Sequence, residues 1–377
     1  MHKLEIKEDQ YIWARSPVRL DLAGGWSDTP PYTFRHGGKV VNMAVNLNDE
    51  LPVQVYIRRS KDPTIKLHSI DLGISEKISD FSQIEKYTDP KLPFVNIKAA
   101  LHLLGFNKQS VGNKIKLSGY LRSMGGGFEI TTFVAIPKGS GLGVSSILGS
   151  TILGALHKLF DNNRDHQHIL NETLKLEQMF TSGGGWQDQA GGIIGSVKYL
   201  ESEPCEEMSF LNLGIEHLDS FLFENNESSH CFTLYYTGLT RLAKNVLQNV
   251  VERVNKNDSE YLDLHGHIKT LAQRARSAIS KRDLISLGQT VKESWLANKN
   301  IHHSTSNQEI DTLLSRLKNY YIGAKLLGAG GGGYCFFVSE SPDQAKKLRQ
   351  KLGEYSIGNA RIVDWNLNTQ GLRVSLS

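Results

Sequence analysis

The spacing of apolar residues changes along the chain, and each change predicts a different element. Residues 11–60 contain short alternating apolar runs, such as "VVNMAVNL" and "LPVQVYI", which predict strands. "FEITTFVAI" (128–136) alternates for most of its length and stops at Pro137, so it predicts a strand that leads into a glycine-rich loop. After this loop apolar residues recur at helical spacing and predict an amphipathic helix; they are Ile147, Leu148, Ile152, Leu156, Leu159 and Phe160.

The pattern differs in the second half of the chain. A second helical stretch at about 165–180 ends in "TSGGGWQDQAGGIIG", and the pattern changes from about residue 205. Beyond this change, "HCFTLYYTG" predicts a strand. "LTRLAKNVLQNVVERVNK" and later segments to about residue 320 predict helices, and "AKLLGAGGGGYCFFVSE" predicts strand, glycine turn and strand. We therefore expect two domains, residues 1–205 and 206–377.

Composition excludes several classes of protein. The chain of 377 residues is 39% hydrophobic and 22% charged, which predicts a soluble globular protein, and its net charge of +4 is too small to indicate nucleic-acid binding. Cys205, Cys231 and Cys335 show no CxxC pairing or metal-ligand spacing, so we expect reduced thiols in a cytoplasmic protein. The polar start "MHKLEIKEDQ" carries no secretory signal, and no apolar run reaches the ~18 residues that span a membrane.

A glycine-rich loop carries the first candidate chemistry. In "PKGSGLGVSS", Gly139, Gly141 and Gly143 allow backbone amides to approach an anion, and the helix that follows adds its positive end. Ser145 and Ser146 fall in the first helical turn, where a hydroxyl can cap the helix, contact phosphate or bind Mg²⁺. The loop lacks the lysine of GxxxxGKS/T. A plain glycine turn with a serine cap is the alternative interpretation.

Two further stretches carry acidic and basic side chains beside glycine turns. "SPVRLDLAGGWSDTPPY" (16–32) places Arg19 on a predicted strand and Asp28 after a turn, whereas "LEQMFTSGGGWQDQAGG" (176–192) places Glu177 on a helix and Asp188 eleven residues later. One carboxylate could then hold a metal while the other faces a substrate hydroxyl. Surface charges and turn caps are the alternatives for each residue taken singly.

The fourth stretch, "KLLGAGGGGYCFF" (325–337), has four consecutive glycines between apolar strands. Such a run costs chain entropy, so we expect its backbone to lie close against a ligand or another part of the site. A flexible linker is the alternative, but linkers are not normally flanked by apolar strands.

Together and in this order, the four stretches resemble the GHMP kinase superfamily, which includes galactokinase, homoserine kinase and mevalonate kinase. "SPVRLDLAGGWSD", "PKGSGLGVSS" and "KLLGAGGGGY" are similar to its three motifs. The resemblance implies an α+β fold of two domains, an N-terminal ribosomal-protein-like domain and a C-terminal ferredoxin-like domain, with the active site between them. Within the superfamily, "GGWSDTPP", "GGGWQDQAGG" and "YTGLTRLAKNVLQ" look most like the L-fucokinases.

The resemblance implies ATP and Mg²⁺ as cofactors and a role for each motif residue. Asp188 would be the catalytic carboxylate beside the sugar hydroxyl, and Arg19 would lie near that hydroxyl and the transferred phosphoryl group. Ser145, with Ser146 as second choice, and Glu177 would bind Mg²⁺. The nucleotide would be bound by Gly139, Ser140, Gly141, Leu142, Gly143, Ser145, Ser146, Gly330 and Gly331.

The sugar side is defined less directly. Asp28 occupies the position that binds sugar hydroxyls in galactokinase, but Gly25 and Trp26 stand where galactokinase has Glu-His. The rings of Trp26 and Trp186 could stack on the apolar face of a 6-deoxysugar, or they could simply pack in the protein. Val144 also stands where many relatives have serine.

The expected activity is therefore phosphorylation of the anomeric hydroxyl of L-fucose by ATP. A D-glycero-D-manno-heptose-phosphate kinase is the first alternative, although that branch has a third glycine in place of Trp26 and calls for an extra basic cluster. A non-catalytic sugar sensor is the second. Expected partners are the sugar and ATP, without nucleic acid or membrane. The resemblance also implies fusion to, or association with, a nucleotidyltransferase, for which this length of chain leaves no room.

Overall fold

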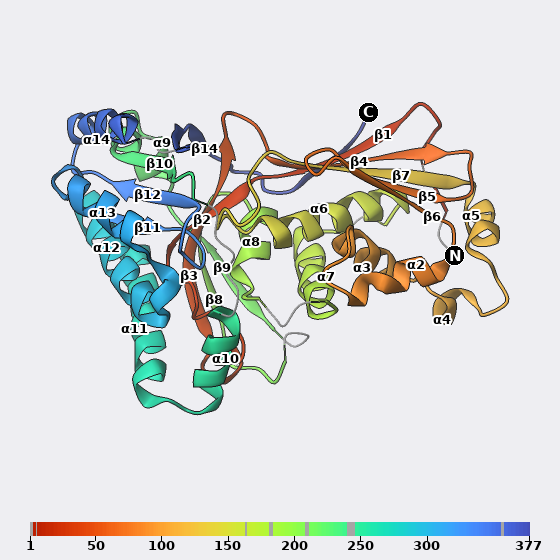
Figure 1. The fold of residues 1–377 in the computed structure, drawn as a ribbon, viewed down its shortest axis with the longest axis horizontal. Coiled ribbons are helices and arrows are strands. Elements are labelled where there is room, and N and C mark those ends of the chain that lie inside the picture. Colours follow the sequence, from red (N-terminus) through yellow and green to blue (C-terminus); the bar gives the residue numbers. More distant parts are fainter. Residues whose placement is uncertain are drawn as a thin grey trace.

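The structure, a computed structural model, describes residues 3–4, 6–162, 164–180, 184–207, 211–239, 246–355 and 358–377. Within them, three β-sheets and the helices packed on them form an α+β architecture (Figure 1). The strands and helices expected from the apolar pattern are confirmed to within a few residues. Residues 240–245 of "YTGLTRLAKNVLQ" lie outside the described residues.

The first sheet has six strands, and helices cover one of its faces (Figure 1). All neighbouring strands are antiparallel except β5 and β7. In spatial order the strands are β15 (Arg373–Leu376), β1 (Tyr11–Ser16), β4 (Val53–Ser60), β7 (Gly127–Val134), β5 (Ile65–Ser69) and β6 (Ile74–Ile78). The helices are α2 (Phe81–Glu85), α3 (Val95–Leu103), α4 (Lys108–Val111), α5 (Leu117–Met124), α6 (Val144–Leu159) and α7 (His166–Gln178).

A second sheet lies between this layer and the C-terminal helices (Figure 1). Its central strand β3 (Gly38–Leu47) pairs with β2 (Val18–Ala23), β8 (Val197–Ser202) and β14 (Trp365–Leu367), and β8 also pairs with β9 (Leu213–His217). Helix α8 (Gln187–Ile193) packs on β2 and β3 and also on α6. Helix α8, which carries Asp188, therefore contacts both the strand that carries Arg19 and the helix that follows the glycine-rich loop.

The third sheet belongs to the second half of the chain. Its order is β11 (Gly323–Leu326), β12 (Tyr334–Val338), β10 (Phe232–Tyr236) and β13 (Arg361–Val363). The associated helices are α10 (Val246–Asn255), α11 (Ser259–Ser280), α12 (Leu284–Ile301), α13 (Gln308–Leu317) and α14 (Pro342–Glu354), with short turns α1 (Tyr32–His36) and α9 (Phe221–Glu224) elsewhere. No described helix has both the length and the apolar character needed to cross a membrane.

The two halves of the chain share sheets. β9, β14 and β15 all come after residue 205, yet they pair with β8, β3 and β1. The domain boundary expected near residue 205 stays a prediction, and the pairing shows that segments beyond it complete the N-terminal sheets.

One buried lysine stands in the second sheet without an acidic partner among the contacts described. Lys198 on β8 faces Asn42 on β3 and His217 on β9, and its side chain is 0% exposed. Its Nζ donates a hydrogen bond of 3.2 Å to the Ser196 carbonyl. Burial lowers the pKa of Lys198 to about 7.

We predict that Lys198→Met stabilises the protein at neutral pH. The unfolded lysine binds its proton up to about pH 10.4, whereas the folded lysine releases it above about pH 7, so wild-type stability rises with pH between these values. The variant should gain about 1–4 kcal/mol of unfolding free energy at pH 7, and the gain should shrink toward pH 10. Denaturant unfolding at several pH values measures it, with the exposed Lys347→Met as control. A gain that does not change with pH would contradict a neutral buried amine.

Candidate functional site

Arg19 connects the acidic group of the site to the glycine-rich loop. Its Nε and Nη2 donate hydrogen bonds of 2.8 and 2.6 Å to Asp188 Oδ1, and its Nη1 donates one of 2.7 Å to the Gly141 carbonyl. The Arg19 side chain is 3% exposed, whereas that of Asp188 is 29% exposed. The structure thus brings these two predicted residues together, with Asp188 as the member that solvent can reach.

Gly191 and Gly192 allow helix α8 to pack closely against Arg19 and α6. A Cβ on Gly191 of α8 would lie 2.4 Å from the Arg19 Cβ, and one on Gly192 would lie 2.5 Å from Ile147 of α6. Any larger residue would push α8 away from β2 or α6. The "AGG" that follows "QDQ" in the sequence is therefore a packing requirement for Asp188.

Neighbouring charges change the pKa values of Arg19 and Asp28. Burial opposes the charged form of Arg19, but Asp188 and Asp21 favour it, and the net effect is a raised pKa for Arg19. The pKa of Asp28 is raised to about 7, first by burial and then by the charge of Asp188. One buried guanidinium therefore faces several carboxylates.

The residues on either side of Asp188 are also held. Gln187 donates from its backbone N to Asp28 Oδ2 and from Nε2 to Asp28 Oδ1, both at 3.1 Å, and its carbonyl accepts from Asn42 Nδ2 at 3.2 Å. Gln189 donates from Nε2 to Glu177 Oε2. The triplet "QDQ" thus contacts four residues, Asp28, Asn42, Arg19 and Glu177. Sequence reasoning used only Asp188 of this triplet and missed Asn42; the repeated amide in "QDQ" was the available signal.

The sugar-side candidates lie in the same region but with different exposures. Asp28 is 1% exposed and also accepts from the Trp26 backbone N at 3.0 Å, so its oxygens already have protein donors. A Cβ on Gly25 would lie 2.5 Å from Asp21 Oδ2 and 2.9 Å from Gln187 Nε2. Trp26 is half-buried and has a φ of 83°. The role of these three in sugar binding stays a prediction.

Trp186 lies inside the protein. It is 0% exposed, belongs to the apolar core and donates from Nε1 to Thr33 Oγ1 at 3.0 Å. Because protein atoms cover the Trp186 ring, its burial favours the packing interpretation over stacking on a sugar.

The candidate metal ligands come from two helices, Ser145 and Ser146 from the first turn of α6 and Glu177 from α7. Glu177 is 7% exposed, and burial raises its pKa to about 8, although hydrogen bonds from Ser146 and Gln189 oppose the rise. Ser146 is buried beside Glu177, whereas Ser145 is exposed and its carbonyl accepts from Asn96 Nδ2 at 3.2 Å. The structure therefore favours Ser146, the second choice, as the partner of Glu177. No group of three or more His, Cys, Asp or Glu suited to a metal occurs among the described residues.

The glycine-rich loop has the backbone geometry that an anion site needs. Gly139, Gly141 and Gly143 have φ values of 78°, 80° and 75°, a region that other residues rarely adopt. Gly143 caps α6 without a side-chain hydrogen bond, so the first amides of a 16-residue helix keep their capacity to bind an anion. Leu142 is buried in the core, and Ser140 Oγ is buried without a partner among the described residues.

The C-terminal glycine run packs directly on this loop. A Cβ on Gly328 would lie 2.8 Å from the Gly141 Cα, and one on Gly333 would lie 2.3 Å from the Ser140 carbonyl, which accepts from Tyr334 N at 3.1 Å. The expectation that the backbone of the run lies close against another segment is confirmed, and that segment is the glycine-rich loop.

Gly330 and Gly331 instead lie against Thr305. A Cβ on Gly330 would be 2.3 Å from the Thr305 carbonyl, which accepts from Gly331 N at 2.6 Å. Their role in nucleotide binding stays a prediction.

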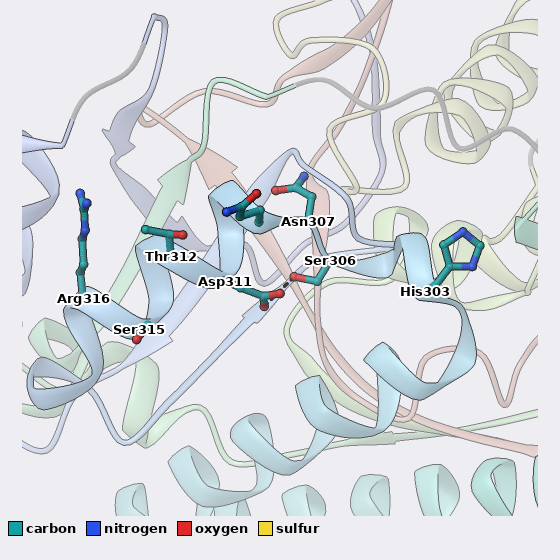
Figure 2. A pocket seen from close by; sticks show the side chains of 8 residues that line it. His303, Ser306, Asn307, Asp311, Thr312, Ser315 and Arg316 are labelled. Atoms are coloured by element: carbon teal, nitrogen blue, oxygen red, sulfur yellow. Dashed lines mark hydrogen bonds between the residues drawn. The ribbon is translucent and has the colours of Figure 1, made fainter.

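An open surface pocket of about 790 Å³ lies beside this contact. Figure 2 shows its lining side chains on α13 and the turn before it, including His303, Asn307, Asp311 and Arg316. Asn307 Nδ2 donates to the Gly331 carbonyl at 3.1 Å. None of the lining residues belongs to the Asp188 group or to the phosphate loop.

Comparison with known proteins identifies the family. Residues 111–196 match the GHMP kinases N terminal domain and residues 275–357 match the GHMP kinases C terminal family. The whole chain is 41% identical to an L-fucokinase/L-fucose-1-P guanylyltransferase of Bacteroides fragilis, and 93% of it is 30% identical to a bifunctional fucokinase/GDP-fucose pyrophosphorylase of Arabidopsis thaliana. The chain spans only 39% and 32% of these two relatives.

Other relatives match from end to end at lower identity. A D-glycero-alpha-D-manno-heptose 7-phosphate kinase of Campylobacter jejuni is 24% identical over 94% of this chain and 99% of its own. The structure of a D-glycero-D-manno-heptose 1-phosphate kinase superposes with a TM-score of 0.69 at 19% identity, covering 97% of this chain and 98% of that one, and supports the fold. Both family domains, the three motifs and the two-domain fold agree: the chain belongs to the GHMP kinases.

Proposed function

We propose that the protein transfers the γ-phosphoryl group of ATP to the anomeric hydroxyl of L-fucose, giving L-fucose 1-phosphate and ADP. The observation that carries the proposal is the Arg19 side chain, which binds both Asp188 and the phosphate loop. A phosphoryl acceptor held by Asp188 would thereby lie near phosphates held by the loop. The two fucokinase relatives support L-fucose as the acceptor.

The residues of this chain would act mainly by positioning and by balancing charge. Phosphoryl transfer needs little covalent help from a protein, so alignment and electrostatics dominate. Asp188 would accept or orient the proton of the sugar hydroxyl, and Arg19 would hold the Asp188 carboxylate in place through its two hydrogen bonds to Oδ1. The amides at the start of α6 would bind the phosphate oxygens.

Glu177 and a serine hydroxyl are the groups of this chain that would hold a magnesium ion. The Glu177 carboxylate is buried and its pKa is raised to about 8, and a bound cation would favour its charged form. A serine hydroxyl, that of Ser146 or Ser145, and Glu177 would hold the ion, and bound Mg²⁺ would neutralise charge on the β- and γ-phosphates. The ion and the loop amides would together supply the positive charge that a lysine supplies in P-loop proteins.

A heptose phosphate is the second candidate acceptor, because the Campylobacter heptose 7-phosphate kinase matches this chain over almost its full length.

The proposed product, a sugar 1-phosphate, is the kind of substrate that a nucleotidyltransferase consumes. The names of both fucokinase relatives include such an activity, which supports fusion to, or association with, a guanylyltransferase.

The acceptor can be identified by ADP release with a panel of sugars. We expect turnover with L-fucose, weaker turnover with D-arabinose, and none with D-galactose or heptose 7-phosphate. Phosphorus NMR of the product should show an anomeric phosphate. Preference for the heptose phosphate would replace the fucokinase assignment, and no turnover with any sugar would favour a sensor.

We predict that Asp188→Asn lowers kcat by about 10²–10⁴-fold, because the amide cannot accept a proton. ATP binding should change by less than about threefold, since the amide oxygen can still accept from Arg19. Steady-state kinetics and isothermal titration measure the two effects. The exposed Asp263→Asn of α11 is the matched control. Unchanged turnover in Asp188→Asn would remove Asp188 from the chemistry.

The two serines can be separated by their magnesium dependence. Ser146→Ala should raise the Mg²⁺ concentration for half-maximal activity by about tenfold or more, because Ser146 lies beside Glu177. Ser145→Ala, one residue away and exposed, should have a smaller effect. The reverse order would support Ser145 as the ligand.

A further inference from the structure

A second buried ion pair lies near the Arg19–Asp188 pair. Lys325 Nζ of β11 donates to Asp21 Oδ2 of β2 at 2.9 Å, and the two side chains are 0% and 2% exposed. Removing two charges from water can cost more than their attraction returns, so such a pair is weak support for stability alone. The segments around the Lys325–Asp21 pair indicate a role beyond stability.

The pair joins three parts of the site. Asp21 follows Arg19 by two residues on β2, so both side chains leave the same face of the strand. Lys325 precedes Leu327 by two residues, and a Cβ on Gly141 would lie 2.2 Å from the Leu327 carbonyl. The turn at Gly25 also lies against the Asp21 carboxylate. Lys325 thus lies where β11 delivers the glycine run to the phosphate loop.

Several carboxylates surround Arg19, and Lys325 pairs with one of them, Asp21. Asp188, Asp21 and Asp28 all act on the Arg19 guanidinium, yet its described hydrogen bonds go to Asp188 and the Gly141 carbonyl and none goes to Asp21. Asp21 has Lys325 instead. Without the lysine charge, Asp21 would be a buried carboxylate that competes with Asp188 for the same guanidinium.

We propose that Lys325 is a positioning residue for phosphoryl transfer, because it neutralises Asp21 and so leaves Arg19 to hold Asp188 against the phosphate loop. This inference rests on the roles proposed above for Arg19 and Asp188. It makes a distinctive prediction: losing the lysine charge alone is worse for turnover than losing both charges of the pair.

The test compares Lys325→Met, Asp21→Asn and the double variant, using the acceptor that the wild type phosphorylates fastest. Lys325→Met should lower kcat about 100-fold, since small misplacements of reacting groups cost this much, while KM for ATP changes less than about threefold. The double variant should turn over at least about tenfold faster than Lys325→Met and within about threefold of Asp21→Asn. Lys198→Met, which removes another fully buried lysine, is the matched control and should leave kcat unchanged.

Thermal unfolding and binding of a non-hydrolysable ATP analogue show whether each variant is folded and binds nucleotide. If Lys325→Met does not fold, the double variant alone decides by the same threefold criterion. A double variant as inactive as Lys325→Met, or a fully active Lys325→Met, would overturn the inference. A fully active Asp188→Asn in the same assay would instead overturn the site assignment, and this inference with it. If the acceptor proves to be a sugar other than L-fucose, the three variants are compared with that sugar and the inference is still tested.

Discussion

The site depends on one guanidinium that is shared between a side chain and a backbone carbonyl. Arg19 is buried and always charged, and it binds Asp188 on one side and Gly141 on the other. An arginine can do this because its donors form a rigid planar fork. The acidic residue and the anion loop, 47 residues apart in sequence, are thereby fixed relative to each other. Every role proposed for the other residues assumes this fixed distance.

The second constraint is the close approach of two glycine-rich backbones. Leu327 and Gly328 lie against Gly141, and Gly333 lies against Ser140, at separations that no Cβ would permit. This contact explains why the chain accepts the entropy cost of so many glycines in two separate segments. It also joins the C-terminal sheet to the glycine-rich loop through the backbone, with a hydrogen bond from Tyr334 N to the Ser140 carbonyl. This contact and the burial of Leu142 in the core both hold the loop in place at the start of α6.

Much of this arrangement could be predicted from sequence because its signals are local. Alternation ending at Pro137, followed by helical spacing, indicated both β7 and α6. The motifs also identified Arg19, Glu177 and Asp188, which the structure brings into one region. The choice between Ser145 and Ser146 could not be made, because adjacent residues on a helix point about 100° apart and only the position of α7 decides which faces Glu177. Asp21 and Lys325 are 304 residues apart, so their pairing depends on how β11 meets β2.

Strand pairing between the ends of the chain has a consequence for synthesis on the ribosome. Arg15 and Ser375, 360 positions apart, meet where β15 borders β1, and β14 borders β3 in the same way. While translation proceeds, both early strands therefore have open edges that await segments not yet made. Such edges attract other extended chains. A nascent protein of this architecture would benefit from a chaperone until its final strands emerge, and truncation before residue 365 should leave it prone to self-association rather than merely shorter.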